Sequence, residues 1–477
     1  MKKSKYLKRV FLIFWVVVLV LPSFACGFGG SGSAVLEIED METEQADAYS
    51  YDIIGGSDVM PIIGYYGPRP NNYSYNANVL PDYYSDEIIG LFAEAGINVI
   101  GTNFTYYTTA PSYVFKLLEQ GEKYHIGVTV WDPMLLEGDN TPEEMDERIN
   151  QYANYPAFCG VHLCDEPGTP YFRGEGNVEL SSLTETAEKL HQLGYPVYAN
   201  LNGRAFGSEN EPQAKEVYEQ YLQDCVDTLK LDYISYDRYI FNENKGLNRA
   251  YLHFQNLETA KKVAKENSIP FWPFVQAGAQ FNDAKDQYDS DGYFPSKGEY
   301  LWMGNTCLAY GAKGLGIFPM LQPYWFAYAQ SEPFDYQRNG LVGAGGNKTR
   351  WFYYTRELTA QIRAIDEVLM NSVSKGVIAA GEDANMAMSN NQDLIAEGAF
   401  RELKGVSGDA IVGCFNYQGK TALYVVNYDV EYAQKITLTL HGNCNVEVTQ
   451  EAQTERYSSD RIILELGAGD GALVVFK

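Results

Sequence analysis

Residues 158 to 167, Phe-Cys-Gly-Val-His-Leu-Cys-Asp-Glu-Pro, are typical of a buried β-strand that ends at two adjacent carboxylates. Because proline has no backbone N–H to donate to a sheet, the strand is predicted to end before Pro167, with Asp165 and Glu166 at its carboxyl end. Side chains alternate across a strand. One face would carry apolar side chains for helices to cover: Cys159, Val161 and Leu163. The other would be small and polar, as in the interior of a barrel near its open end: Gly160, His162, Cys164 and Glu166.

Short apolar strands followed by longer segments with helical spacing recur eight times between residues 60 and 370. Eight such units predict either a closed (β/α)8 barrel or a doubly wound sheet. The first unit has no Gly-x-Gly-x-x-Gly turn, which removes the usual argument for a nucleotide-binding sheet. The third and fifth strands are aliphatic on one face only, whereas a doubly wound sheet would be apolar on both. We therefore predict an α/β fold, a (β/α)8 TIM barrel over residues 58–372.

After Met370 the pattern changes to short alternating strands separated by turns. The predicted strands span residues 409–416, 422–427, 435–440, 462–466 and 472–476. This pattern predicts a small C-terminal β-sandwich over residues 373–477. Two roles remain open for it, packing against the barrel and independent sugar binding.

The amino terminus has the layout of an export signal, with basic residues, an apolar run over residues 10–21, and the small residues Ser23 and Ala25. We predict a signal peptide over residues 1–25 and a flexible acidic linker over residues 26–57. Cys26 resembles the lipid-bearing cysteine of bacterial lipoproteins, although Ser23 stands where the lipobox usually has Leu. Lipidation of Cys26 with a membrane tether, ordinary secretion and an uncleaved anchor remain open. The predicted location is extracellular or at the cell surface.

Composition excludes several classes of function. The 477 residues carry a formal charge of −26, which argues against nucleic acid as a partner. The five histidines form no His-x-His or His-Glu-x-x-His motif and the seven cysteines form no Cys-x-x-Cys pair, so neither a metal site nor a cofactor is expected. No Gly-x-Ser-x-Gly esterase motif is present. Cys414 and Cys444 could form a disulfide, but buried free thiols are the preferred interpretation.

The carboxyl ends of barrel strands hold the active site, and glycosidic cleavage needs a proton donor and a second group at the oxocarbenium-like centre. Adjacent carboxylates repel, so one is expected to hold its proton, which suits Glu166 as the acid beside Asp165. Asp237, at the end of the sixth strand, is the other candidate carboxylate. Residues predicted to bind the sugar through amides or aromatic rings are Tyr66, Asn103, Trp131, Asn202, Tyr236, Trp272, Gln276 and Trp325. A rim ion pair of Asp165 or Glu166 with Arg173 or Arg238 is the structural alternative.

An eight-unit barrel with Glu at the end of its fourth strand resembles the clan A glycoside hydrolases, over about residues 58–370. The C-terminal phrases Leu-Tyr-Val-Val-Asn-Tyr-Asp and Gly-Ala-Leu-Val-Val-Phe resemble the sandwich of many barrel glycosidases. The resemblance implies that Glu166 is the acid/base, although Asp165 precedes it where the clan usually has Asn. On the seventh strand, where the clan has its nucleophilic Glu, this chain has Gln276, and an amide cannot act as a nucleophile.

Three interpretations of the missing nucleophile remain open. In the first, Asp237 is the nucleophile. In the second, an N-acetyl group of the substrate attacks, steered by Asp165. Adjacent Asp-Glu resembles the substrate-assisted β-N-acetylhexosaminidases, and Tyr236-Asp237 resembles the pair that holds the acetamido group in chitinase-type barrels. In the third, the site binds glycan without cleaving it.

The predicted function is an exported glycosidase that acts on an oligo- or polysaccharide. The rival is a non-hydrolytic surface glycan-binding protein on a barrel scaffold. A scaffold barrel with no sugar role is the third option.

Overall fold

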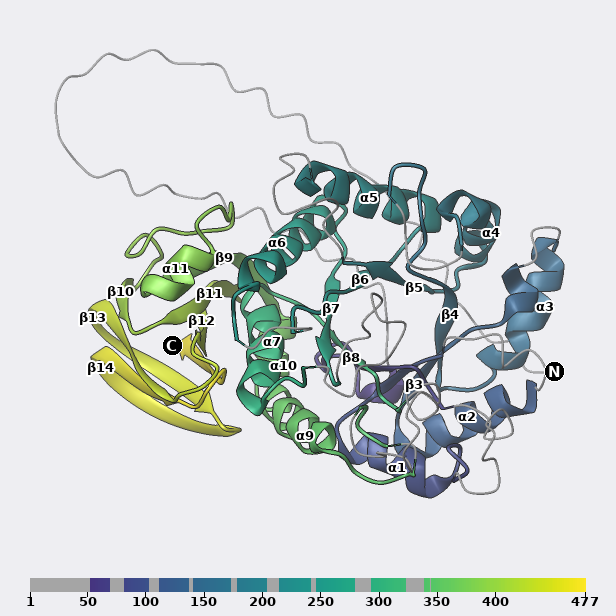
Figure 1. Cartoon of the computed structure of the whole chain (residues 1–477), viewed down its shortest axis with the longest axis horizontal. Coiled ribbons are helices and arrows are strands. Elements are labelled where there is room, and N and C mark those ends of the chain that lie inside the picture. The colour runs from purple at the N-terminus through teal and green to yellow at the C-terminus, as the bar shows by residue number, and fades with distance from the viewer. Residues whose placement is uncertain are drawn as a thin grey trace, which may run out of the picture. The chain divides into compact units, whose positions relative to one another are not determined.

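The structure is a computed structural model that describes residues 52–68, 81–102, 111–136, 140–172, 178–203, 214–241, 246–278, 293–322, 339–343 and 345–477. Eight parallel strands close into a barrel in chain order, and β8 pairs with β1 (Figure 1). They are β1 Ile62–Tyr65, β2 Val99–Gly101, β3 Gly127–Val130, β4 Phe158–Asp165, β5 Val197–Asn202, β6 Ile234–Asp237, β7 Phe271–Gln276 and β8 Leu315–Phe318. The predicted (β/α)8 barrel is confirmed, and the doubly wound sheet is excluded.

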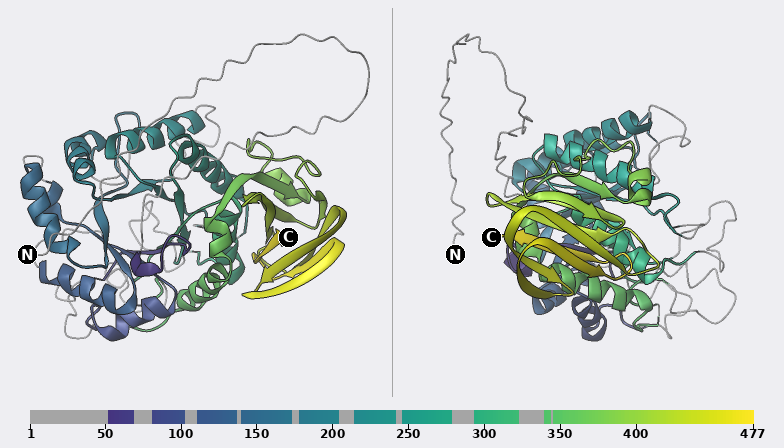
Figure 2. Two further views of the ribbon diagram at one scale, coloured as in Figure 1. Left: turned by 180° about the vertical axis from the view of Figure 1, so that it is seen from behind. Right: turned by 90° about the vertical axis from the view of Figure 1, so that its left-hand side faces the viewer.

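Helices surround the ring of strands (Figures 1 and 2). They are α1 Asp86–Glu94, α2 Pro111–Tyr124, α3 Pro142–Ala153, α4 Thr184–Leu193, α5 Ala214–Leu229, α6 Ala250–Glu266, α7 Lys297–Ala309, α9 Arg350–Arg363 and α10 Asp366–Met370. Local sequence sets where two of them begin. Thr141 and Ser296 each form a capping box, with Glu144 at the start of α3 and Glu299 at the start of α7.

The side chains of β5 and β7 alternate as predicted. Tyr198 of β5 and Trp272 and Phe274 of β7 lie in an aromatic cluster inside the barrel. Ala199 and Leu201 of β5 belong to the core between strands and helices. The interior of the barrel is therefore a packed core below the strand ends, as in other (β/α)8 barrels.

Strict alternation is wrong for β4, because this strand contains two register shifts. One extra residue lies opposite β3 and one opposite β5, between His162 and Cys164. A bulge of this kind moves the following side chains to the other face. Cys159, expected outside, lies in the interior cluster, and Cys164, expected inside, lies in the outer core near Cys225 of α5. The second bulge also turns Asp165 toward the barrel axis, where it meets Tyr65.

The C-terminal region is a seven-stranded antiparallel sheet in the order β10-β13-β15-β12-β11-β9, with β14 paired to β13. The strands are β9 Ser372–Ala380, β10 Leu403–Ser407, β11 Ala410–Tyr417, β12 Lys420–Asn427, β13 Gln434–Gln450, β14 Gln453–Leu466 and β15 Gly471–Phe476. The sequence pattern did not predict β9, β10 or the helix α11 (Glu382–Ala387). The first part of β13 pairs with β10 and its last part with β15, so the sheet curves over its own core, consistent with the predicted β-sandwich (Figure 2).

The two faces of this sheet pack against different cores. Ile411, Tyr424 and Val475 belong to the core shared with the barrel. Their neighbours along the strands, such as Val412 and Val425, fill the core of the sandwich. Asn305 of α7 fixes the contact, since it donates to Gly469 O at 2.9 Å and accepts from Tyr424 Oη at 2.8 Å. The C-terminal sheet therefore packs against α7, which was one of its two predicted roles.

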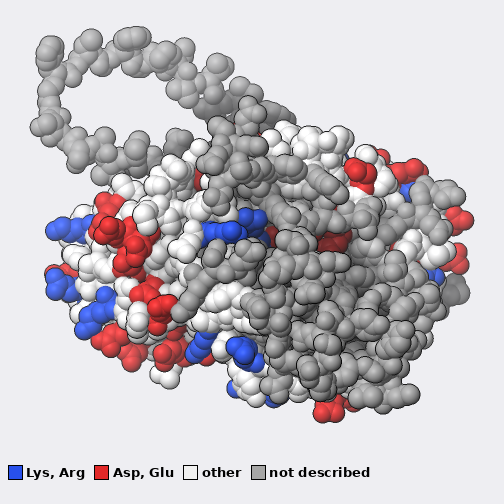
Figure 3. Space-filling view, in the orientation of Figure 1, with Lys and Arg blue, Asp and Glu red and all other residues white. Residues whose placement is uncertain are grey.

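Several other sequence expectations can be compared with the described residues. The six cysteines from Cys159 to Cys444 are free thiols. No helix in the described part of the chain is long and apolar enough to cross a membrane. Acidic and basic side chains are interspersed over the described part of the C-terminal sheet that Figure 3 shows. Cys26 and the predicted export signal lie outside the described residues.

A buried histidine between α6 and α7 predicts that the folded protein is less stable at acidic pH. His253 is 3% exposed, and its Nε2 lies 2.8 Å from Thr306 Oγ1. Burial, and next the nearby Arg238 charge, lower the pKa of His253 to about 3. The unfolded chain binds this proton below about pH 6.5 and the native state does not, so the free energy of unfolding falls as pH falls from about 6.5 toward 3.

Between pH 6.5 and pH 5, the free energy of unfolding of the wild type should fall by about 2 kcal/mol more than that of His253→Gln. Urea unfolding of both proteins at the two pH values measures the difference. Identical pH dependence would contradict the assignment of this proton to His253.

Candidate active site

Asp165 lies at the carboxyl end of β4 and is held by two donors. Tyr65 Oη donates to Asp165 Oδ1 at 2.7 Å, and Asn200 Nδ2 donates to the same oxygen at 3.1 Å. Tyr65 ends β1 and Asn200 is on the inner face of β5, so three strands fix this carboxyl group. Asp165 is still half-buried rather than sealed, which leaves it at the edge of the open end of the barrel.

Asp237 is brought to the same place by β6. Asn200 Nδ2 also donates to Asp237 Oδ1, at 3.2 Å. Since one nitrogen contacts both carboxyl groups, their two oxygens are separated by no more than the sum of the two distances. That limit is below the roughly 6.5 Å at which the carboxyl pairs of inverting glycosidases begin. Asp165 and Asp237 are therefore close enough to act on one sugar residue.

Glu166 completes a cluster of three carboxyl groups. Its backbone has φ of 45°, a left-handed conformation that a residue with a side chain rarely adopts. Its N–H donates to Asn200 O at 2.8 Å. Burial raises the pKa of Tyr239 well above its usual value, and the charges of Asp237, Glu166 and Asp165 raise it further. Tyr239 therefore lies near all three carboxyl groups.

His162 forms the floor beneath Asp165. Its Nδ1 contacts Thr102 O, and its Nε2 lies 2.9 Å from Cys164 O. Burial lowers the pKa of His162, so the ring is neutral at neutral pH. Trp131, half-buried at the end of β3, packs edge-on against it with centroids 5.1 Å apart. His162 is therefore a hydrogen-bonded residue of the barrel interior, on the face where the sequence placed it.

Aromatic rings line one side of the opening. Tyr66, at the end of β1, packs edge-on against Phe318 of β8 with centroids 5.1 Å apart. Tyr239 stacks on the same Phe318 ring at 5.6 Å. Tyr66 also has a positive φ, 66°, so two of the strand ends that bear site residues are strained. Both Tyr66 and Tyr239 are half-buried and can present ring faces to a sugar.

Not every residue predicted to bind sugar lies here. Tyr236 is 1% exposed and faces the helices, near Tyr218 of α5 and Cys307 of α7. Trp272 lies deep in the barrel, stacked on Tyr233 with centroids 3.7 Å apart. The structure therefore brings neither of them to the carboxyl cluster.

The remaining predicted residues are placed as follows. Asn202 and Gln276 end β5 and β7 and are each 2% exposed. Gln276 Nε2 donates to Phe241 O and Gly278 O, each at 2.8 Å. Its amide nitrogen is therefore used in hydrogen bonds to the backbone. Asn103 and Trp325 lie outside the described residues.

Asn200 is the site residue that sequence reasoning missed. The alternation in β5 placed it on the inner face, but only the structure shows that one amide contacts two carboxyl groups. Another strand-end carboxylate, Asp132, is excluded from the site by its partners. Arg148 Nε and Tyr152 Oη each lie 2.5 Å from its Oδ2.

No protein-family model matches the sequence, and no curated protein matches it. Among solved structures, a β-galactosidase from the psychrophilic Marinomonas ef1 is 10% identical with a TM-score of 0.50, over 88% of this chain and 100% of that one. An α-amylase from Geobacillus thermoleovorans is 10% identical with a TM-score of 0.45, over 88% and 98%. At these identities the likeness shows the fold alone. The structural neighbours are (β/α)8-barrel glycoside hydrolases, so the predicted resemblance is confirmed.

The described residues contain no cluster of three or more His, Cys, Asp or Glu side chains arranged to hold a metal ion. Two of the three carboxyl groups are held by neutral donors: Tyr65 and Asn200 donate to Asp165, and Asn200 also donates to Asp237. What the arrangement can do is exchange a proton and place negative charge beside a bound sugar.

Proposed function

We propose that this protein hydrolyses glycosidic bonds of an oligo- or polysaccharide. One observation carries the proposal: Asn200 contacts both Asp165 and Asp237 at the carboxyl end of a (β/α)8 barrel, where Glu166 directly follows Asp165. A glycosidase needs a proton donor and a second carboxylate, or a group of the substrate, at the anomeric carbon. The fold of the structural neighbours supports the same reading.

Glu166 is assigned as the general acid. It would donate its proton to the glycosidic oxygen as the bond to the anomeric carbon breaks, and in the next step take a proton from the attacking water. The negative charges of Asp165 and Asp237 nearby favour the protonated form of Glu166 before the reaction. The left-handed backbone at Glu166, directly after Asp165, supports a special role for this position.

The group that attacks the anomeric carbon is either Asp237 or an N-acetyl oxygen of the substrate. In the first case a covalent glycosyl ester forms on Asp237 and water then hydrolyses it. In the second, Asp165 would orient the acetamido group, and the oxazolinium formed would be opened by water. The hydrogen bonds that Asp165 accepts from Tyr65 and Asn200 support this role, because they fix its carboxyl group. Tyr236 faces the helices, so it gives no support to the second route.

The aromatic side of the opening would bind the sugar ring. Tyr66 and Tyr239 flank Phe318, and ring faces of this kind stack on the C–H face of a pyranose. Trp131, which packs edge-on against His162 at the end of β3, would contribute a further ring. We propose these residues in place of Tyr236 and Trp272 as the described part of the sugar-binding surface.

The proposal is tested by assaying the purified mature protein on a panel of aryl glycosides that includes N-acetylhexosaminides. Turnover of at least one, above a no-enzyme control, is the expected result. Binding of glycans without turnover of any substrate would favour the non-hydrolytic glycan-binding protein. The absence of both binding and turnover would favour a scaffold barrel with no sugar role.

The location proposed for this activity is outside the cell, with Cys26 as a lipid anchor. It rests on the amino-terminal sequence alone. Metabolic labelling with a fatty acid tests it, and label that persists in Cys26→Ser would contradict the anchor.

Asn200 supplies a test of the site geometry. Asn200→Ala removes the donor shared by Asp165 and Asp237, so their charges repel without a bridging N–H. We expect kcat/KM to fall about 100-fold, the size of effect seen when one preorganised donor is lost, and the pH–rate profile to shift. Asn385→Ala on the exposed face of α11 is the control and should retain full activity. An unchanged pH profile in Asn200→Ala would contradict the bridging role.

A further inference from the structure

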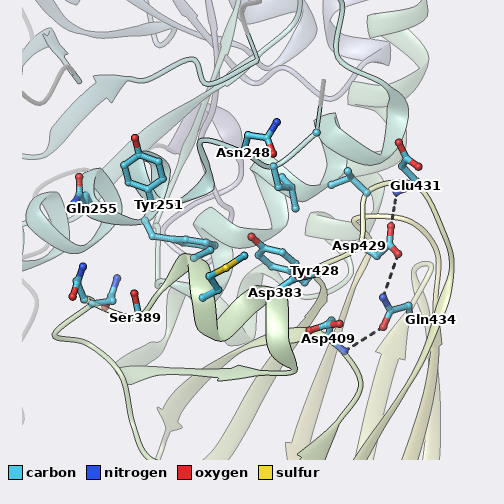
Figure 4. Close-up of a pocket in the computed structure, with 18 of the residues that line it drawn as sticks. Asn248, Tyr251, Gln255, Asp383, Ser389, Asp409, Tyr428, Asp429, Glu431 and Gln434 are labelled. Carbon is cyan, nitrogen blue, oxygen red and sulfur yellow. Dashed lines mark hydrogen bonds between the residues drawn. The ribbon is translucent and has the colours of Figure 1, made fainter. Parts of the chain in front are cut away.

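A cavity of about 710 Å3 lies between α6 and the C-terminal sheet (Figure 4). Its walls come from the residues around the start of α6, from α11 and the residues after it, and from the segment between β12 and β13. The volume is that of a pocket for a small molecule. None of the residues assigned to the candidate active site lines it.

The described lining is strongly acidic. It includes five carboxylates and no Lys or Arg: Glu258, Asp383, Asp409, Asp429 and Glu431. Two of these carboxylates already have partners within the protein. Glu258 pairs with Lys215 at 2.7 Å, and Asp429 Oδ1 accepts the N–H groups of Glu431 and Tyr432 at 2.8 and 3.0 Å. Asp383 and Asp409 have no ion-pair partner among the described residues.

Two polar groups of the lining, the hydroxyl of Tyr428 and one oxygen of Asp409, have no hydrogen-bond partner among the described residues. Tyr428 is 6% exposed and lines the cavity. Figure 4 shows its ring in the middle of the lining residues, between Tyr251 and Asp429. Its hydroxyl makes no hydrogen bond with any described residue. The buried Oδ1 of Asp409 also has no hydrogen-bond partner among them, which is unusual for a buried polar atom. Burial, followed by the charges of Asp383 and Asp409, raises the pKa of Tyr428, so both carboxylates act at this hydroxyl.

We propose that this cavity binds an organic cation that carries ammonium groups. An ammonium N–H would donate to the Tyr428 oxygen and to Asp383 or Asp409, which would supply the partners that these groups lack. The rings of Tyr251 and Tyr432 also line the cavity. Their faces attract a cation within about 6 Å. An anionic ligand is disfavoured by the five carboxylates. The proposal does not depend on the proposed glycosidase activity.

The test is isothermal titration calorimetry of the full-length mature protein with spermidine as the probe, at low and at physiological salt. One saturable site is expected, with an affinity that falls as salt rises. Asp383→Asn should weaken binding at least tenfold. Tyr428→Phe keeps the ring packed on Trp302, at 5.9 Å between centroids, and should weaken binding severalfold without a change in net charge.

A matched control separates this site from general attraction to an acidic protein. Glu382 precedes Asp383 in α11, is exposed and does not line the cavity, so Glu382→Gln removes the same charge and should bind spermidine as the wild type does. Equal weakening in Glu382→Gln and Asp383→Asn would overturn the proposal. So would no binding, or binding of a neutral oligosaccharide that is lost in Tyr428→Phe, which would make the cavity a sugar site.

Discussion

Glu166→Gln is expected to lower kcat/KM about 1,000-fold on substrates with poor leaving groups, because the amide has no proton to give to the glycosidic oxygen. Substrates with an activated aryl leaving group depend less on protonation by the acid, so Glu166→Gln should lower their kcat/KM by a smaller factor. The substitution preserves size and hydrogen-bonding capacity at a half-buried position. Steady-state kinetics on an aryl glycoside and on a natural oligosaccharide measure the contrast.

The control for this prediction is Glu185→Gln, at the exposed start of α4, which should leave both activities unchanged. The melting temperature of Glu166→Gln should stay within about 2 °C of the wild type, since a surface-accessible isosteric change costs little stability. Full activity of Glu166→Gln on the oligosaccharide would exclude Glu166 as the acid.

The same assay distinguishes the two proposed nucleophiles. If Asp237 attacks, Asp237→Ala loses activity on every substrate, and added azide restores turnover as a glycosyl azide. If the substrate attacks, only N-acetylated substrates are cleaved by the wild type and azide restores nothing. Asp237→Ala removes the hydrogen bond from Asn200 under either mechanism. Its free energy of unfolding should therefore change by the same small amount whichever group is the nucleophile.

Gly413→Ala is expected to destabilise the contact between barrel and C-terminal sheet by about 3 kcal/mol or more. A Cβ at Gly413 of β11 would lie 2.3 Å from the backbone oxygen of Ala309, at the end of α7, and 2.8 Å from its Cα. Backbone atoms of a packed helix cannot move aside as a flexible side chain can. The melting temperature should fall by roughly 5 °C or more.

Gly442→Ala is the matched control, because Gly442 lies in β13 of the same sheet and a Cβ there would meet nothing within 4 Å. It should melt within about 1 °C of the wild type. The candidate active site is formed by barrel strands, so the activity of folded Gly413→Ala at low temperature should be unchanged. A melting temperature for Gly413→Ala equal to that of Gly442→Ala would show that the sheet does not approach α7 so closely.

Much of the architecture can be predicted from periodicity and from local signals that act within a few residues. The alternation of aliphatic with polar and aromatic residues in β5 predicted one inner and one outer face. The capping residues Thr141 and Ser296 mark where α3 and α7 begin. The edge strands β9 and β10 were missed, because their burial comes from neighbours distant in sequence.

The sequence by itself determined the eight strand–helix units, the carboxylates at the strand ends and the change to a β-sheet after Met370, because these depend on residue order and local chemistry. Only the tertiary structure decided which side chains meet. Two bulges in β4 turned Cys164 outward and Asp165 inward, and closure of the barrel brought Asn200 between Asp165 and Asp237. The physical reason is that register across neighbouring strands is set by the pairing of whole elements, and a shift of one residue exchanges the faces of a strand.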